Sequence, residues 1–226
     1  MKRLLIAESI PLIANIIAGY FSDGWDVQTC HSTQDAEEAL QRQMPEALII
    51  CDNGETVDAR TILANSFPLL PPTIFVVTPN ATSQSQKDLA RWGVDCIFEP
   101  PYEPKLVRLA LDFFHNSQDA TAKRVAQHLR VLGIPAGPNG HLYLLFATSM
   151  LKQDMTQQLH NEIYYKIACT VNVDERSVEK AIRSLIRNAW DRRNEKIWAR
   201  YFPVNEKGAV PCPKNKAFIY TLAQIV

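Results

Sequence analysis

The pattern of apolar and polar positions changes character near the middle of the chain. Along the first half, short apolar runs alternate with segments in which apolar residues recur every three or four positions. Such an alternation of strands and helices predicts a parallel sheet with helices on both faces. The predicted strands are Leu4–Ala7, Trp25–His31, Ala47–Cys51, Thr73–Thr78 and Cys96–Phe98.

The segments between these strands carry helix start signals. Ser9 precedes Pro11, and Ser32 lies three residues before Asp35, as expected near a helix N-terminus. Asp58 begins a third helix by the same criterion. The last two predicted helices are Ser83–Trp92, ending at Gly93, and Glu103–Phe114. Residues 1–116 therefore have the size and element order of a flavodoxin-like (βα)5 receiver domain, an α/β fold.

The second half has no convincing strand pattern. The polar stretch 117–122 predicts a linker, and residues 123–226 are predicted to form an all-α domain. Its first helix ends at Gly133-Ile134-Pro135, because Gly accepts a left-handed backbone and Pro cannot extend the helix. The predicted helices are Lys123–Leu132, His141–Lys152, Thr156–Thr170, Asp174–Trp190, Glu195–Tyr201 and Lys216–Ile225.

Charge separates the two halves further. The whole chain is neutral, but residues 1–118 hold 8 basic and 15 acidic residues, a net charge of −7, and residues 119–226 hold 16 and 9, a net charge of +7. This asymmetry indicates an acidic module joined to one that meets a polyanion. No apolar run is long enough to span a bilayer, so no membrane association is expected. The 5 cysteines form no C-x-x-C pair, and a reducing cytoplasm is the expected location.

The predicted helix from Asp174 to Trp190 has two distinct faces. At about 100° per residue, four basic side chains fall on one side, with Ser177, Ser184 and Asp191 nearby. Apolar residues occupy the other side and predict a core stripe. Asp174 is a good N-cap residue, placed at the positive end of the helix dipole. The four basic residues are Arg176, Lys180, Arg183 and Arg187, and we call them the basic face.

The residues upstream complete a predicted helix-turn-helix. Ile167-Ala168 place a bulky and then a small residue where two helices would cross, and Val171-Asn172-Val173 would form the turn. The turn position usually needs a left-handed backbone, which Asn adopts more readily than most residues. The alternative is an ordinary amphipathic helix with a solvated basic face, but the charge asymmetry favours DNA binding.

Residue types on this helix suggest how DNA would be bound. Arg183 and Lys180 can donate to guanine O6 and N7 in the major groove. Ser177 and Ser184 can reach base edges or phosphates. Four arginines near the helix ends are better placed to hold phosphates, which set register and affinity but not sequence choice. These are Arg176, Arg187, Arg192 and Arg193.

With a receiver-like half before it, this helical half resembles the stage 0 sporulation protein A family of response regulators, which are transcription factors of endospore-forming Firmicutes. The resemblance covers about 100 residues of the second half. The motifs are Leu132-Gly-Ile-Pro-Ala-Gly, Gly140-His-Leu-Tyr-Leu, Ser177-Val-Glu-Lys-Ala-Ile-Arg-Ser-Leu-Ile-Arg-Asn-Ala-Trp, Arg192-Arg-Asn and Asn215-Lys-Ala-Phe-Ile.

The resemblance implies a sequence-specific transcription regulator that binds duplex DNA, with homodimers on tandem sites and RNA polymerase or a phosphorelay protein as further partners. The implied DNA-contacting positions are Ser177, Glu179, Lys180, Arg183 and Ser184. Glu179 can accept from a cytosine amino group, and the alternative for Glu179 is a salt bridge with Arg183.

The first half departs from the receiver pattern at the carboxyl ends of its strands. Aspartyl-phosphate chemistry needs a carboxylate at the end of the third strand, two acidic residues after the first strand to hold Mg²⁺, and a Lys after the fifth. Here the aspartate position is Cys51, followed by Asp52, and the lysine position is Glu99. We expect a pseudo-receiver without a cofactor; Mg²⁺ or Ca²⁺ in this acidic pocket is not expected. The residues concerned are Glu8, Ser9, Cys51, Asp52, Thr78 and Glu99, which we call the strand-end cluster.

Three alternatives remain at this point. Asp52 would be the phosphoacceptor of a conventional phosphorelay regulator if the strand slipped by one residue, although successive strand residues point to opposite sides. An enzyme is disfavoured, because Cys51 has local carboxylates that oppose thiolate formation. An adaptor would use the basic face to bind an acidic protein. His141 and His160 are interpreted as helix-surface residues, and the aromatic residues Trp190, Trp198, Tyr201 and Phe202 as core.

Overall fold

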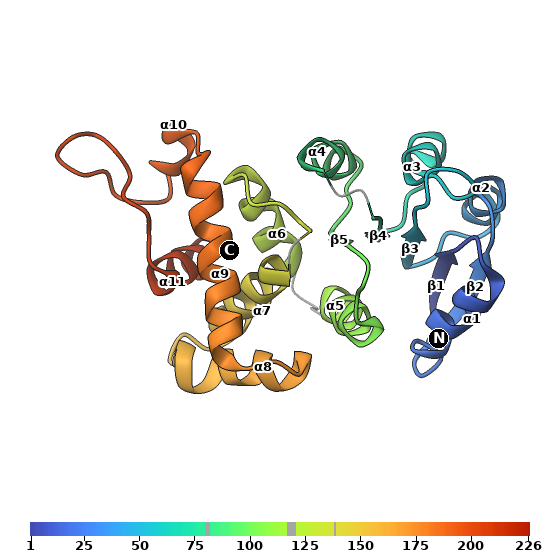
Figure 1. Cartoon of the computed structure of the whole chain (residues 1–226), viewed down its shortest axis with the longest axis horizontal. Coiled ribbons are helices and arrows are strands. Elements are labelled where there is room, and N and C mark those ends of the chain that lie inside the picture. The colour runs from blue at the N-terminus through green and yellow to red at the C-terminus, as the bar shows by residue number, and fades with distance from the viewer. Residues whose placement is uncertain (80–81, 117–120, 138) are drawn as a thin grey trace. The chain divides into compact units, whose positions relative to one another are not determined.

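The chain divides into two compact units, Met1–Asn116 and Ser117–Val226. Figure 1 shows the computed structural model of the chain, in which the structure describes residues 1–79, 82–116, 121–137 and 139–226. Each unit has its own core. Of the predicted linker 117–122, residues 117–120 lie outside the described residues. The linker prediction is wrong at its end, because Thr121 and Ala122 are buried residues of the first helix of the second unit.

The first unit is a five-stranded parallel sheet of order β2-β1-β3-β4-β5. This order, with helices between the strands, confirms the predicted flavodoxin-like receiver fold. Strands β3 and β4 are buried along their whole length, as expected for a sheet covered on both faces. The strands are β1 (Lys2–Ala7), β2 (Trp25–Cys30), β3 (Ala47–Cys51), β4 (Thr73–Val77) and β5 (Cys96–Phe98).

Helices cover both faces of this sheet, with α2, α3 and α4 on one side and α1 and α5 on the other (Figure 1). Two predicted caps form: the Ser32 hydroxyl accepts from the Asp35 N–H at 3.1 Å, and the Asp58 carboxylate accepts from the Thr61 N–H at 2.6 Å. The helices are α1 (Pro11–Gly19), α2 (Thr33–Arg42), α3 (Ala59–Ser66), α4 (Ser83–Arg91) and α5 (Pro104–Asn116).

The start of α1 differs from the prediction. Its N-cap residue is Ile10, not Ser9, and the Ile10 side chain makes no capping hydrogen bond. The Glu8 carboxylate instead accepts a hydrogen bond from the Ile10 N–H at 2.9 Å. Ser9 precedes the cap by one residue and donates to Glu8 at 3.3 Å, so its hydroxyl serves the strand-end cluster and not the helix.

The described residues of the second unit form helices joined by loops and contain no strand, as predicted. The helix predicted at Thr156–Thr170 is shorter, because Asp154 and Thr156 form a hydrogen-bonded turn ahead of it. It begins with one π-helical segment, η1, which continues directly into α8. The helices are α6 (Thr121–Val131), α7 (Asn139–Gln153), η1 (Leu159–Tyr164), α8 (Tyr165–Val171), α9 (Glu175–Asp191), α10 (Glu195–Trp198) and α11 (Asn215–Ile225).

Helix α7 is the centre of this unit. It is buried on nearly every side and packs against α6, α9 and α11. His141 of α7 is 2% exposed, so its assignment to the helix surface is wrong. Because apolar residues surround α7 on nearly every side, the sequence pattern does not show which face of this helix is buried. Trp198 and Phe202 are buried core aromatics as predicted, each near Phe218. In the described part of the chain, none of the helices has the length and apolar character needed to span a bilayer.

Candidate nucleic-acid interface

The turn between α8 and α9 has the geometry that the sequence predicts. Asn172 has φ 55° and ψ 49°, and it is the one described residue other than glycine with a positive φ. This left-handed residue ends α8, and the Val173 N–H then donates to the Ala168 carbonyl at 3.0 Å. Ile167 and Ala168 are both buried at the crossing. The two helices therefore form a helix-turn-helix, with α9 as its second helix.

The start of α9 is capped as predicted. The Asp174 carboxylate accepts from the Ser177 N–H at 2.9 Å and from the Ser177 hydroxyl at 2.6 Å. These hydrogen bonds lower the pKa of Asp174, because they favour its charged form. The Ser177 hydroxyl is thus held by the cap, and a contact with a DNA base would compete with this hydrogen bond.

The two faces of α9 separate as expected. The apolar stripe is buried, and the basic face is exposed along its length. The side chains of Arg176, Lys180 and Arg187 make no hydrogen bond or ion pair with any residue that the structure describes. Ser184, also exposed, lies between them on the same face. The buried residues are Val178, Ile182, Leu185, Ile186 and Ala189.

Arg183 and Glu179 lie at the edge of this face. The Arg183 guanidinium donates to the Pro213 carbonyl at 2.7 Å, from the segment that leads into α11. The salt bridge between Glu179 and Arg183 that was the alternative from sequence does not form. The Glu179 carboxylate instead lies 4.0 Å from Nδ1 of His160. Arg183 is therefore exposed but already oriented by its own protein.

The two arginines after α9 have different environments. Arg192 is exposed and donates to the Asn188 carbonyl at 3.1 Å. The Arg193 side chain is only 17% exposed, forms an ion pair with Glu195 at 2.7 Å and lies 4.0 Å above the Trp190 ring. Arg193 is thus the basic residue in the predicted set that the protein itself engages most.

In the first unit, part of the strand-end cluster is gathered in a small polar site. Glu8, at the end of β1, is 8% exposed, and its carbonyl is 2.8 Å from Nδ1 of His31. Cys51 at the end of β3 is buried beside the Glu8 carboxylate. Burial raises the pKa of the Cys51 thiol, and the nearby Glu8 raises it further. Cys51 is therefore a protonated thiol at neutral pH.

Asp52 follows the last residue of β3, and its carboxylate is held by the loop after that strand. Its Oδ1 accepts from the N–H groups of Gly54 and Ala59, each at 3.2 Å, at the start of α3. The neighbouring Asn53 donates from its side chain to the Ser9 hydroxyl at 3.1 Å. The Asp52 carboxylate therefore helps to shape the loop after β3.

The remaining members of the cluster do not share one environment. Thr78 follows β4 and is buried, with its N–H donating to the Phe98 carbonyl at 2.9 Å, whereas Glu99 is exposed. Sequence reasoning missed Tyr102, whose hydroxyl is a hydrogen-bonding neighbour of Cys51. The pKa of Tyr102 is raised by burial and then by Cys51 and Glu8. The signal for Tyr102 that the sequence offered was the presence of an aromatic residue shortly after β5.

The strand order and the helix-turn-helix together define a response-regulator architecture with a receiver-type first unit and a helical effector unit. Residues 125–226 match the family described as the sporulation initiation factor Spo0A C terminal. The second unit is thus similar to that family over residues 125–226, and this match confirms the resemblance to the stage 0 sporulation protein A family.

Solved receiver structures resemble the first unit. A CheY-like response regulator receiver domain protein from Methanospirillum hungatei is 15% identical, with a TM-score of 0.49 over 53% of this chain and 97% of that chain. A two-component response regulator from Clostridium difficile is 12% identical, with a TM-score of 0.48 over 53% and 99%. The signal receiver domain of a DNA-binding response regulator from Colwellia psychrerythraea is 15% identical, with a TM-score of 0.47 over 52% and 100%.

Proposed function

We propose that this chain is a transcriptional regulator that binds duplex DNA through α9. The observation that carries the proposal is the exposed basic face, opposite a buried stripe, on the second helix of a helix-turn-helix. Such a helix fits the major groove with its cationic side towards the bases and phosphates. The Spo0A-family effector unit supports the same function and, with it, homodimers on tandem sites.

We further propose that the receiver unit is not phosphorylated by the usual route. Its phosphoacceptor position holds the protonated thiol of Cys51, and the Asp52 carboxylate binds two backbone N–H groups of its own loop. The exposed Glu99 supplies negative charge where a phosphoryl group needs a cation. We therefore infer no catalytic role for this unit.

Receiver folds of this kind usually bind Mg²⁺, and the residues present here do not fit that ion. Mg²⁺ requires an octahedral set of oxygen ligands. Glu8 already accepts two hydrogen bonds from its own segment, and Cys51 offers a neutral sulfur. Within the described ranges, His, Cys, Asp and Glu side chains form no group of three or more that would hold a metal.

Binding of the full-length chain to a panel of duplexes tests the DNA-binding proposal. Arg183→Ala is expected to relax base preference, because Arg183 lies where a side chain can reach a guanine edge. Arg187→Ala is the matched change on the same face, and it is expected to weaken all sequences alike. Arg193 would be a poorer comparison, because Glu195 and Trp190 hold its side chain.

The same measurements separate DNA binding from the adaptor alternative. The logarithm of the binding constant for DNA should fall with the logarithm of salt concentration by about 0.9 per phosphate contacted. Equal losses of selectivity in both variants would contradict the assigned roles. An absence of duplex binding at low salt would instead favour an acidic protein as the partner.

Acetyl phosphate tests the pseudo-receiver proposal. Incubation of the full-length chain with acetyl phosphate and Mg²⁺ is expected to leave the intact mass unchanged. An adduct of about 80 Da, the mass of one phosphoryl group, would contradict the proposal. Repeating the incubation with Asp52→Asn would show whether such an adduct lies on Asp52.

A further inference from the structure

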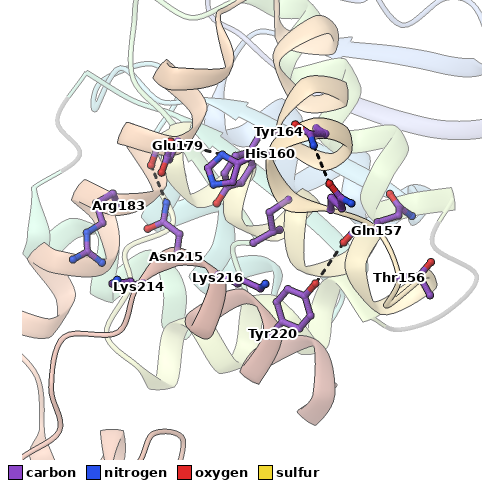
Figure 2. Close-up of a pocket in the computed structure, with 13 residues that line it drawn as sticks. Thr156, Gln157, His160, Tyr164, Glu179, Arg183, Lys214, Asn215, Lys216 and Tyr220 are labelled. Atoms are coloured by element: carbon purple, nitrogen blue, oxygen red, sulfur yellow. Dashed lines mark hydrogen bonds and ion pairs between the residues drawn. The ribbon is translucent and has the colours of Figure 1, made fainter.

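A cavity of about 670 Å³ opens beside α9, within the second unit. Its walls come from the segment 156–164, from α9 and from the start of α11 (Figure 2). This volume is in the range of small-molecule sites, which extends from about 300 to 1,000 Å³. The residues that line the cavity include His160, Tyr164, Arg183, Lys214, Asn215 and Lys216.

The charged residues in the cavity wall are predominantly basic. Arg183, Lys214 and Lys216 line it, and Glu179 is the one acidic residue among the described lining residues. The N-terminus of α11 also lies in the wall. This helix has 11 residues, and no side chain caps it, so its first N–H groups and its dipole favour an anion. The electrostatics of the cavity therefore suit a negatively charged ligand.

Two buried polar atoms in the same wall lack hydrogen-bond partners. Tyr164 is 1% exposed and Asn215 is 7% exposed. Neither the Tyr164 hydroxyl nor Oδ1 of Asn215 makes a hydrogen bond of normal geometry with the described residues, although the two side chains are neighbours. A buried polar group without a hydrogen-bond partner destabilises the folded protein. Such a pair of atoms is expected where a ligand supplies the missing partners.

The two atoms have complementary hydrogen-bonding roles. Burial raises the pKa of Tyr164 to about 12, so its hydroxyl remains a donor. Nδ2 of Asn215 donates to the Glu179 carbonyl at 3.0 Å, and this fixes the amide with its oxygen as the unsatisfied acceptor. A ligand that satisfies both atoms must accept one hydrogen bond and donate another.

We propose that this cavity binds the phosphate monoester of a small molecule. A phosphate monoester carries acceptor oxygens for Tyr164 and the α11 N–H groups, negative charge for Arg183, Lys214 and Lys216, and, when protonated once, an O–H for Asn215. A phosphodiester of the DNA backbone shares the charge but has no proton to donate. The acceptor atom of Asn215 therefore favours the monoester over DNA.

Binding of inorganic phosphate to the full-length chain tests this proposal. Amide NMR titration at constant ionic strength is expected to shift the N–H signals of Lys216 and Ala217 at the start of α11. Lys214→Ala with Lys216→Ala should weaken binding at least tenfold. The control pair Lys196→Ala with Lys207→Ala removes two exposed lysines outside the cavity and should leave the affinity within a factor of two.

Two further measurements distinguish a built site from general anion attraction. Tyr164→Phe should weaken phosphate binding several-fold without lowering the melting temperature, because the hydroxyl it removes is unsatisfied in the free protein. Sulfate, which has no proton at neutral pH, should bind more weakly than phosphate. Absence of the Lys216 and Ala217 shifts, equal binding of sulfate, or an equal loss in the control pair would each overturn the proposal.

The salt dependence of duplex binding shows whether the cavity binds a phosphate of the DNA backbone instead. If the Lys214 and Lys216 pair lowers the salt slope by about 0.9 per lysine while free phosphate does not bind, the cavity takes a DNA phosphate and the monoester proposal fails. If phosphate binds but duplex DNA does not, the cavity proposal stands and the proposed DNA-binding function fails. The two proposals are therefore tested independently.

Discussion

The strand-end cluster of the first unit and the basic face of the second use their polar side chains in opposite ways. In the cluster, Glu8, Asp52 and Cys51 are engaged by neighbouring backbone or side-chain groups. On the basic face, Arg176 and Lys180 have no partner among the described residues and lie open to solvent. Polar groups that are buried with partners support the fold of the first unit, whereas the exposed cations of the basic face are accessible to a ligand.

Thiol reactivity should show the largest difference between the two regions. Cys51 is buried with a raised pKa, whereas Cys169 of α8 is exposed. Because only an accessible thiolate reacts, Cys169 is expected to react with a disulfide reagent at least about 100-fold faster than Cys51. Peptide mass spectrometry over a time course at pH 8 measures both rates in one sample. Comparable rates without denaturant would show that the strand-end cluster opens easily.

Gly140 tests the close packing of α7 against α9, the helix that carries the basic face. A Cβ added at Gly140 of α7 would meet the Ala181 carbonyl oxygen of α9 at 2.7 Å. Gly140→Ala should therefore push the two helices apart, at a cost of about 1–3 kcal/mol of unfolding free energy. Urea unfolding of the full chain, followed by hydrogen exchange of peptides from each unit, should show this loss in the second unit alone.

The matched control for this change is Gly19→Ala. Gly19 ends α1, has no atom within 4 Å of an added Cβ and is not among the glycines with positive φ. The substitution should be neutral or slightly stabilising, because Ala restricts the unfolded chain more than Gly does. Equal destabilisation by both changes would contradict the close crossing of α7 and α9.

His141 is expected to make the second unit sensitive to acid. Its burial and, as a smaller cause, the positive charge of Arg130 together lower its pKa from 6.5 to about 4. Between these values the unfolded chain binds a proton that the folded chain does not, so stability is lost as pH falls below about 6.5. The expected loss between pH 7.5 and 5 is about 2 kcal/mol.

His141→Phe should flatten this pH dependence in the second unit. Hydrogen exchange of α7 peptides at the two pH values, corrected for the intrinsic exchange rate, measures the local unfolding free energy. Peptides from β3 provide an internal reference in the same sample. An unchanged pH dependence in the variant would assign the acid sensitivity to other groups.

The sequence predicted most elements because their signals are local. Alternating apolar runs identify the strands, and caps such as Ser32 and Asp174 depend on residues within one helical turn. The errors concern contacts between segments far apart in the chain. Tyr102 reaches Cys51 across the sheet edge, and Arg183 donates to the carbonyl of Pro213, which lies 30 residues further along the chain. Local periodicity carries no information about such contacts.

The cavity beside α9 illustrates the same limit for the candidate site. It combines the turn region before η1 with the first residues of α11, which are more than 50 positions apart in the numbering. The sequence showed Lys214 and Lys216 as part of the positive charge of the second half, but not that they line one cavity with Arg183. Only the packing of α11 against α7 and α9 brings these residues together.

The smallest predicted effect concerns the turn that sets the direction of the basic face. Asn172 has a left-handed backbone with φ 55°, which costs a residue with an ordinary side chain about 1–2 kcal/mol. Asn172→Ala should therefore lower the stability of the second unit by about 1 kcal/mol, and Asn172→Gly should change it little, because Gly tolerates this conformation. Urea unfolding of the unmodified chain and of the two variants measures the order of their unfolding free energies. A Gly variant less stable than the Ala variant would mean that the Asn172 side chain, and not its backbone conformation, holds α8 and α9 at their angle.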